Sequence, residues 1–327
     1  MSTKDYFSQI TYLMIETNSS CNLKCSFCNR EELVAKGWRA PLNLNIEQFR
    51  KILSPFKDCP IDTIKLEGIS EPMMHPKFHD LALELRQTFP DAFVIIATNL
   101  QYNLKKTSFL DTLAHVDMVY LSIDGEGEDY EKARPGATWK RLVQSLEDIK
   151  SLVPVEVRRS KLHINFVCTE FNFHCLPKMY ELKEAYDLAS VRINLAQNWS
   201  EDQQNSRDFH SEMRIFLKQY ASDVKGVAEW RYRDCFWPHS GIIIDVEGNI
   251  RQCIINTSQN PIGNIHKDNV RDIYNNSEHY LRVRESLAIE EPIEACKNCD
   301  YSLLTHALKD IFEEQQSTQP PRSFIRL

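Results

Sequence analysis

Short apolar segments and longer amphipathic segments alternate along the first two thirds of the chain. The short segments are rich in β-branched and aromatic residues and are bounded by polar residues, which is typical of buried β-strands. We predict strands over residues 10–17, 61–66, 93–97, 118–123, 162–168 and 191–195. Because helical segments separate these strands, we expect them to lie parallel with right-handed crossovers, in a partial barrel or an open doubly wound sheet.

The segments between the strands carry apolar residues on one helical face. Asn45 and Gln48 have the pattern of a capping box, and an apolar stripe over residues 46–53 accompanies it. The same spacing predicts helices over residues 78–89 and 139–149. The fold class indicated is therefore α/β.

The pattern changes after Trp199. Polar residues 200–214 predict a connector that leads into a helix around Phe216. Residues 241–253 predict a hairpin with its turn at Gly248, because glycine tolerates a positive φ. The predicted parts are a core domain over 1–200, a linker and helix over 201–233, a small C-terminal domain over 234–315 and a tail over 316–327.

Composition and charge exclude several classes of protein. At 327 residues, with 42% hydrophobic and 26% charged residues, the chain is globular and fits one large domain or one domain with an appendage. The net charge of -7 lacks the basic field that binds nucleic acids or anionic membranes. No apolar run approaches the ~20 residues of a spanning helix, and the N-terminus lacks the apolar core of a signal peptide. We therefore expect a cytoplasmic protein without nucleic-acid or membrane partners.

The chain has ten cysteines, most of which gather in two groups. In a reducing cytosol such groups indicate metal ligation or catalysis and not a disulfide framework. The front group is Cys21, Cys25 and Cys28, the back group is Cys235, Cys253, Cys296 and Cys299, and the scattered cysteines are Cys59, Cys168 and Cys175.

The front group has the spacing CxxxCxxC and directly follows the first predicted strand. Three thiolates can hold three irons of a four-iron cluster and leave the fourth iron without a protein ligand, where chemistry takes place. A zinc knuckle, or three cysteines packed on one helix face, also fits this spacing. The back group supplies four thiolates, which close the shell of either a tetrahedral zinc ion or a four-iron cluster.

With this front group the chain resembles the radical SAM enzymes. In that family the CxxxCxxC loop follows the first strand of a partial (βα)6 barrel and binds a [4Fe-4S] cluster and S-adenosylmethionine (SAM). The resemblance implies such a cluster on Cys21, Cys25 and Cys28, and it places Phe27 near the adenine of SAM.

Further segments match the family in the same order. Residues 66–72, LEGISEP, resemble the family's GGEP segment, whose backbone receives the methionyl amino group of SAM. Ser70 stands where glycine is usual, so we expect an altered geometry there. Thr98 and Asn99 resemble the family's TNG turn, with Leu100 in place of its glycine. The resemblance implies SAM binding by Gly68, Ser70, Glu71, Ser122, Asp124, Arg134 and a residue near Leu195.

Each of these matches also has an ordinary interpretation. Ser122 and Asp124 fit a plain strand end, Arg134 fits a surface charge, and Glu71 fits a carboxylate at a helix N-terminus. Their order along the chain is what joins them into one prediction.

The segments around the back group resemble the C-terminal auxiliary-cluster extension of some radical SAM enzymes. The full form, SPASM, has seven cysteines and two extra clusters, whereas four cysteines resemble the shortened form, Twitch. The resemblance implies a second [4Fe-4S] cluster on Cys235, Cys253, Cys296 and Cys299, and it extends to about Phe312. Ligation by four cysteines indicates that this cluster passes electrons and does not bind substrate.

The resemblance also implies the chemistry. The front cluster would donate one electron to SAM, and the resulting 5′-deoxyadenosyl radical would take a hydrogen atom from the substrate. The electron would come from an external donor such as flavodoxin or ferredoxin. We expect an oxidoreductase that acts on a sugar or aminocyclitol alcohol, because the cluster architecture is similar to that of the aminocyclitol dehydrogenase of butirosin biosynthesis.

Three other functions stay open. A peptide-modifying radical SAM maturase would act on a ribosomally made peptide, although the first strand begins near residue 10 and leaves no room for a leader-binding domain. A redox-neutral epimerase would need a hydrogen donor, for which Cys168 is the candidate, although a small buried hydrophobe also fits that position. If both groups hold zinc, the protein is a binding module. No general base is assigned.

Overall fold

The computed structural model describes residues 4–196, 211–220, 232–254, 260–297 and 299. Within these residues one sheet runs in the order β6-β5-β4-β3-β2-β1-β7-β8-β9. Each of the six predicted strands is present and pairs in parallel with its neighbour in the chain, as predicted. They are β1 (Tyr12–Ile15), β2 (Thr63–Leu66), β3 (Phe93–Thr98), β4 (Met118–Ser122), β5 (Leu162–Cys168) and β6 (Ser190–Leu195).

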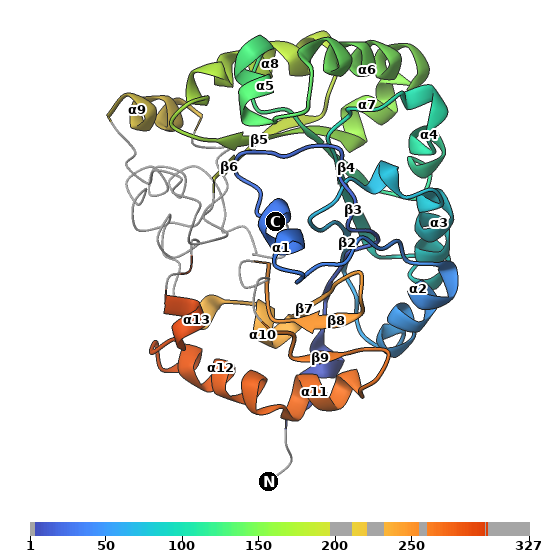
Figure 1. Ribbon diagram of the computed structural model, residues 1–327, viewed down its shortest axis with the longest axis vertical. Helices are drawn as coiled ribbons and strands as arrows, with labels where there is room; N and C mark the ends of the chain where they lie inside the picture. The colour runs from blue at the N-terminus through green and yellow to red at the C-terminus, as the bar shows by residue number, and fades with distance from the viewer. Residues whose placement is uncertain (1–3, 197–210, 221–231, 255–259, 298, 300–327) are drawn as a thin grey trace.

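The parallel strands curve into an open barrel with helices along its outside (Figure 1). This curvature selects the partial barrel over the open doubly wound sheet. The outer helices are α2 (Ile46–Leu53), α3 (Phe78–Thr88), α4 (Phe109–Thr112), α5 (Gly127–Ala133), α6 (Trp139–Leu152), α7 (Val155–Lys161) and α8 (Leu176–Ala185). The short helix α1 (Arg30–Ala35) lies within the arc of strands in this view.

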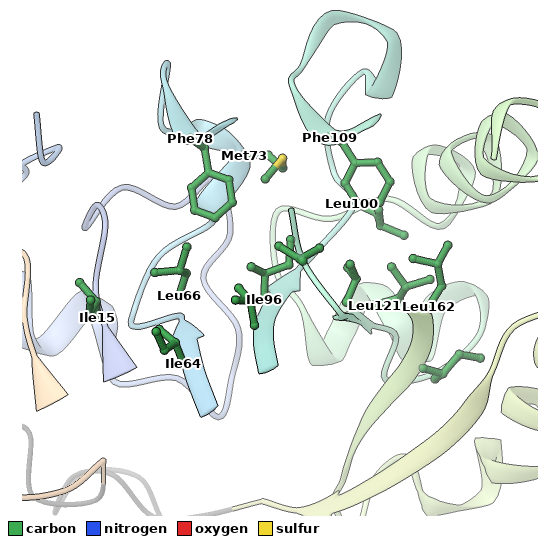
Figure 2. Close-up of a cluster of buried hydrophobic side chains, with 14 of the residues drawn as sticks. Ile15, Ile64, Leu66, Met73, Phe78, Ile96, Leu100, Phe109, Leu121 and Leu162 are labelled. Carbon is green, nitrogen blue, oxygen red and sulfur yellow. The ribbon is translucent and has the colours of Figure 1, made fainter. Parts of the chain in front are cut away.

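The two faces of the strands differ in character. Outward side chains are apolar and pack beneath Phe78 of α3 and Phe109 of α4 (Figure 2). Burial of one such aliphatic side chain contributes about 1.5–3 kcal/mol, which explains why the sheet and outer helices form one core. In β5 the outward residues are buried, whereas His163 and Asn165 on the concave face are half-buried. The concave face is therefore where polar chemistry is available.

Local sequence starts the outer helices where it predicts them. The Asn45 side chain accepts a hydrogen bond from the Gln48 backbone at 2.9 Å, and Gln48 reciprocates at 3.0 Å, which confirms the capping box. Thr138 Oγ1 accepts from the backbone N–H of Arg141 at 3.2 Å and caps α6. The helix predicted around Phe216 is α9 (Ser211–Gln219).

The C-terminal segment extends the same sheet. β7 (Gly241–Ile244) pairs in parallel with β1, because its apolar residues are buried on both faces and suit an inner strand. β8 (Asn249–Arg251) forms the predicted hairpin with β7, and Gly248 in its turn has a φ of +80°. The remaining elements are β9 (Gly263–Asn264), α10 (Trp237–Ser240), α11 (Val270–Asn276), α12 (Glu278–Ala288) and α13 (Glu294–Lys297).

Parts of the predicted domain plan lie outside the described residues. These are most of the linker over 201–233, the tail over 316–327 and Phe312, near which the resemblance was expected to end. The helices that the structure describes include none with both the length and the apolar character of a membrane span.

Candidate active site

The front cysteines lie on a loop that β1 delivers to the mouth of the barrel. Two backbone hydrogen bonds tie this loop to the C-terminal end of α5 and the residues after it: Ser26 donates to Ala133 at 3.1 Å and Lys24 donates to Pro135 at 2.9 Å. Gly136 follows with a φ of +96°, and a Cβ there would lie only 3.3 Å from a carbonyl of the loop. A side chain at position 136 would therefore combine a strained backbone with a tight approach to the cysteine loop.

The front thiols lie in a buried environment that disfavours their thiolate forms unless a cation is nearby. Burial raises the pKa of all three thiols, and that of Cys28 reaches about 11. The charges of Cys21 and Cys25 raise the Cys28 pKa further, so the three groups lie near one another. Arg134 opposes this effect at Cys25, because its Nη1 donates to the Cys25 sulfur at 3.6 Å. Metal binding needs thiolates, and a bound metal would supply the missing positive charge.

The spacing of the sulfurs tests which metal group fits. A tetrahedral zinc ion holds each sulfur at about 2.3 Å, which brings the sulfurs within about 4 Å of one another. In the part of the chain that the structure describes, no three cysteine sulfurs all lie within 4.8 Å of one another. An iron-sulfur cluster bridges sulfurs that lie farther apart than the ligands of one ion, so both groups are compatible with a [4Fe-4S] cluster.

Glu71 fastens the ends of β2 and β3 beside the front loop. Its buried carboxylate accepts hydrogen bonds from Thr98 Oγ1 and the Asn99 backbone, both at 2.7 Å, and from the Met73 backbone at 3.2 Å. Asn99 Nδ2 in turn lies 3.9 Å from the sulfur of Cys21. Burial raises the pKa of Glu71 to about 7. Because protein groups occupy this carboxylate, Glu71 positions the loop instead of offering a free ligand.

The Ser70 side chain has a hydrogen-bond partner, Asn18, that was not predicted from the sequence. Its hydroxyl donates to Asn18 Oδ1 at 3.0 Å. Asn18 Nδ2 donates to the carbonyl oxygens of Glu71 at 3.0 Å and Ser20 at 3.2 Å. The serine side chain therefore joins a buried bridge between β1 and the loop after β2, which explains how the chain tolerates a residue other than glycine.

Gly68 lies against a buried network of charges. A Cβ at this position would lie 2.2 Å from Glu16 Cγ, so no larger residue fits without a shift. Glu16 is 3.3 Å from Arg39, and Arg39 is 3.6 Å from Asp245, which also pairs with Arg251 at 2.9 Å. These side chains, all nearly inaccessible to solvent, join the ends of β1 and β7 to the loop that carries Gly68.

Arg134 and Asp124 form a buried ion pair next to the front group. The guanidinium lies 5.4 Å from the ring centroid of Phe27, and Asp124 accepts a hydrogen bond from the Val167 backbone at 2.6 Å. Asn172 Nδ2 donates to the Asp124 carbonyl at 2.9 Å. The structure thus brings Phe27, Asp124 and Arg134 together with Cys25, as the motif order predicts.

Three other candidate positions lie along the strand ends. Ser122 ends β4 on the concave face, opposite Asn165 of β5. Leu195 ends β6 with its side chain in the apolar core, so its side chain does not join the other predicted SAM residues. Cys168 is also in that core and is 1% exposed. It shares the outward face of β5, so it cannot return a hydrogen atom to a substrate on the concave face, and the epimerase hypothesis loses its candidate donor.

The back group lies against the concave side of β1 and β7. Cys235 and Cys253 pack on a small buried cluster of Tyr12, Met14, Trp237 and Ile243. Burial raises the pKa of Cys235, and the charges of the other three back cysteines add to this effect. Gln252 Nε2 donates to the sulfur of Cys296 at 3.4 Å. The four thiols therefore form one group, as predicted.

Several buried polar residues of this region were not predicted from the sequence. They are Glu16, Asn18, Arg39, Asn172, Asp245 and Arg251. A signal existed for the first two, because polar residues that directly follow a buried strand lie at its functional end. Arg39, Asn172 and Asp245 lie in loops and Arg251 ends β8, and their contacts are far apart in sequence, so no local pattern marks them. Among the scattered cysteines, Cys59 donates to the Phe7 carbonyl at 3.4 Å, which is a structural role.

Comparison with known proteins agrees with this geometry. A family model described as the radical SAM superfamily matches residues 15–182, and one described as an iron-sulfur cluster-binding domain, SPASM, matches residues 235–300. A tungsten-containing aldehyde ferredoxin oxidoreductase cofactor-modifying protein of Pyrococcus furiosus is 29% identical over 179 residues, which are 51% of this chain and 46% of that protein. A GTP 3′,8-cyclase of Vibrio vulnificus is 25% identical over 113 residues, 35% of this chain and 33% of that protein. The matched region thus spans less than half the length of either relative.

Solved structures share the fold. SuiB of Streptococcus suis bound to SAM has a TM-score of 0.65 at 16% identity and covers 85% of this chain and 68% of its own. anSMEcpe with bound SAM has a TM-score of 0.66 at 16% identity, with coverages of 94% and 98%. BtrN in complex with SAM and 2-DOIA has a TM-score of 0.53 at 15% identity, with coverages of 89% and 93%. At these identities the likeness shows the fold alone.

Proposed function

Because the chain belongs to the radical SAM superfamily, we propose that it cleaves SAM reductively and oxidises an alcohol group of a small substrate, a sugar or an aminocyclitol. Its radical SAM and SPASM regions imply [4Fe-4S] clusters, and the solved neighbours bind SAM. When bound, the front cluster would supply one electron to SAM, and the 5′-deoxyadenosyl radical so formed would take a hydrogen atom from a substrate carbon. An external donor such as flavodoxin or ferredoxin provides that electron.

In this proposal the residues around the front loop bind and orient. Cys21, Cys25 and Cys28 would hold the cluster. Arg134 keeps Cys25 and the Phe27 ring in place through the contacts described above. The buried ion pair of Arg134 with Asp124 fixes the guanidinium without exposing it to water, which preserves the geometry that radical chemistry needs.

The observation that supports oxidation is the back cysteine group. Its four thiols can fill every ligand position of a cluster, so substrate has no place on the metal. Converting an alcohol to a ketone removes one hydrogen atom, one proton and one further electron. A second cluster held by these four cysteines would accept that electron. Two of the cysteines, Cys235 and Cys253, pack against residues of β1, the strand that leads into the front loop.

A peptide substrate is the second candidate. SuiB bound to the precursor peptide SuiA, and anSMEcpe bound to the Kp18Cys peptide, have TM-scores of 0.66 and 0.64 against this chain, above the 0.53 of BtrN. The likeness concerns the fold, so the two candidates are separated by the product. An oxidised polyol supports the alcohol oxidation, whereas a modified peptide in place of an oxidised polyol overturns it.

The experiment that tests the proposal compares two proteins purified and reconstituted without oxygen. One is the parent chain and the other carries Ala at Cys21, Cys25 and Cys28. We expect about eight irons per chain in the parent and about four in the variant, because one of two clusters is lost. With dithionite and SAM, the parent should release 5′-deoxyadenosine and the variant should not.

Cys59→Ala serves as the matched control, because Cys59 is buried and belongs to neither group. It should keep the parent's iron content and SAM cleavage. About two zinc ions per chain with no iron, or iron without SAM cleavage, contradicts the proposal.

A further inference from the structure

Two cations on the concave face of the barrel converge on one tyrosine. Tyr120 lies in β4, with Lys65 on β2 to one side and Arg192 on β6 to the other. The Lys65 ammonium is 5.8 Å from the centroid of the Tyr120 ring, and the Arg192 guanidinium carbon is 5.1 Å from it. Cations are attracted to the face of an aromatic ring, so this ring gathers positive charge in the interior.

The partners of these two cations differ. Lys65 lies 2.8 Å from Glu67 Oε2, an ion pair without hydrogen-bond geometry. Arg192 donates to two neutral oxygens, Tyr120 Oη at 2.7 Å and Asn194 Oδ1 at 3.1 Å. Within the described ranges of the chain, no carboxylate oxygen lies within 4.0 Å of the Arg192 guanidinium. The group therefore carries one positive charge in excess of its carboxylates.

The neighbours of Arg192 hold it on the concave face. Arg192 lies directly opposite Asn165 of β5, and Asn165 lies opposite Ser122 at the end of β4. Asn194 donates to Asn165 and accepts a hydrogen bond from Arg192, so this pair of amide side chains fixes the position of the arginine. A half-buried arginine that is fixed by neutral partners keeps guanidinium donors available, and an oxyanion is the ligand that matches such donors.

We propose that Arg192, Tyr120 and Lys65 form a binding site for an oxyanion, so that the substrate is a small molecule with a phosphate or carboxylate group. This inference rests on the proposed function, because it places a polar substrate inside the barrel of a radical enzyme. It narrows the substrate from any sugar or aminocyclitol to one that carries an anionic group.

The test measures how anions protect Arg192 from phenylglyoxal, which modifies arginine side chains. The reconstituted protein with SAM is treated without oxygen in chloride, acetate or inorganic phosphate at one ionic strength, and modification is mapped by mass spectrometry. Phosphate at about ten times its dissociation constant should slow the reaction at Arg192 about tenfold, since protection follows 1 + [L]/Kd. Exposed Arg50 on α2 is the internal control, and its rate should be equal in all three salts.

The acetate and phosphate arms separate the two sources of the anion. Protection by phosphate alone indicates a phosphorylated substrate, and protection by acetate alone indicates a carboxylic acid. Reactivity of Arg192 that is equal in chloride, acetate and phosphate overturns the proposal.

Tyr120→Phe tests the site with a second variant that keeps the ring. Loss of its hydroxyl should raise the half-protecting phosphate concentration about tenfold. Tyr186→Phe is the matched control, because that hydroxyl bonds Glu147 at 2.8 Å and belongs to no part of this site. An unchanged concentration in Tyr120→Phe contradicts the tyrosine's part in the site.

Cleavage of SAM by the same preparation of the parent distinguishes the two proposals. If dithionite gives 5′-deoxyadenosine but no anion protects Arg192, only the anion site fails. If phosphate protects Arg192 but SAM is not cleaved, only the proposed function fails.

Discussion

Leu100 occupies a backbone conformation that usually belongs to glycine. Its φ is +58°, in the turn after β3 that places Asn99 beside Glu71 and Cys21. An L-residue there costs about 1–2 kcal/mol, because its Cβ crowds the following carbonyl. The Leu100 side chain is fully buried beneath the outer helices (Figure 2), and its burial offsets this cost. The turn thus keeps a strained backbone where the site requires it.

A first prediction follows from this conformation. Leu100→Ala should lower the free energy of unfolding by about 2–5 kcal/mol through the lost burial. Leu100→Gly should be no less stable than Leu100→Ala, because glycine adopts a positive φ without strain. Leu85 is the control, since it is equally buried but lies within α3, where glycine should be about 1 kcal/mol worse than alanine. Thermal unfolding of the reconstituted proteins shows whether the glycine or the alanine variant is more stable at position 100 and at position 85. A Leu100→Gly protein that melts below the Leu100→Ala protein contradicts the argument.

Gly68 sets a steric limit on the loop after β2. Gly68→Ala should cost about 1–3 kcal/mol of stability, because the new methyl group meets Glu16 Cγ. It should also weaken SAM binding about tenfold or more, a loss of about 1.4 kcal/mol, since the displaced loop carries Ser70 and Glu71. Equilibrium dialysis with labelled SAM measures this effect. Gly37→Ala is the control, as nothing lies within 4 Å of a Cβ there. SAM binding by Gly68→Ala within twofold of the parent would sink the prediction.

The elements of the barrel mouth are connected by charge as well as by the sheet. Glu16 follows β1, Asp245 follows β7, Arg251 ends β8, and Arg39 comes from the loop after α1. The pairs between them cross four segments that are far apart in sequence. Removing one partner of a buried ion pair leaves the other charge without compensation, which is strongly destabilising. The network therefore makes the C-terminal hairpin part of the active-site mouth.

Glu16 gives this network a pH dependence. Burial raises its pKa to about 7, against the opposing charges of Arg39 and Arg251 and with the support of Asp245. The folded protein thus binds a proton on Glu16 at pH values where the unfolded chain does not, so this residue's contribution to stability grows as pH falls from about 8 to 5. We expect the stability of the parent relative to Glu16→Gln to rise by about 1–3 kcal/mol over that range.

The measurement is the difference in melting temperature between the two proteins, reconstituted and kept without oxygen, at pH 5.5, 7 and 8. Histidines and other groups titrate equally in both proteins, so the difference isolates Glu16. A difference that is constant with pH, or that grows toward pH 8, contradicts the prediction.

At the level of elements, the sequence predicts much of the fold. Strand and helix periodicity identify β1 to β6, and Asn45, Thr138 and Gly248 mark helix starts and a turn by local chemistry. The partnership of β1 with β7 is not predictable in this way, because pairing between distant strands leaves no periodic signal. The same holds for the network of Glu16 and Asp245, which depends on that pairing.

For the molecule as a whole, the cysteine groups and the order of motifs predict which residues form the site. The structure adds the contacts that these residues make and the buried residues around them. Phe27, Asp124 and Arg134 come together as their order indicates. Which face of a strand meets the barrel interior depends on register and curvature. The sequence therefore left Cys168 open as a hydrogen donor or a small buried hydrophobe and did not place Leu195, whereas the structure has both in the outer core. Likewise, the sequence does not predict that Lys65 and Arg192 meet at Tyr120, because their contact depends on how β2, β4 and β6 curve around one barrel interior.

The distribution of ligands predicts how the whole molecule responds to iron removal. All seven candidate ligands lie outside the strands, in loops or short helices. The buried residues of the apolar core that holds β2 to β6 together include none of them, and only Cys21 and Cys25 pack against that core. Removing iron with a chelator should therefore increase hydrogen exchange in residues 19–29, 232–240 and 252–254, and leave β2 to β6 protected. Exchange measured by mass spectrometry on the holo and iron-free proteins checks this. Equal loss of protection in β3 and β4 contradicts a self-sufficient core.

The place of β7 beside β1 has a consequence for synthesis on the ribosome. β1 is made first, but the strand that covers its second edge follows about 225 residues later. At about 5–20 residues per second, that edge stays open for roughly 10 to 50 s while the other strands assemble. An open strand edge is a template for pairing with other chains. A nascent chain of this protein is therefore most prone to self-association in the interval before Gly241–Ile244 leaves the exit tunnel, and a chaperone that shields β1 would act within that interval.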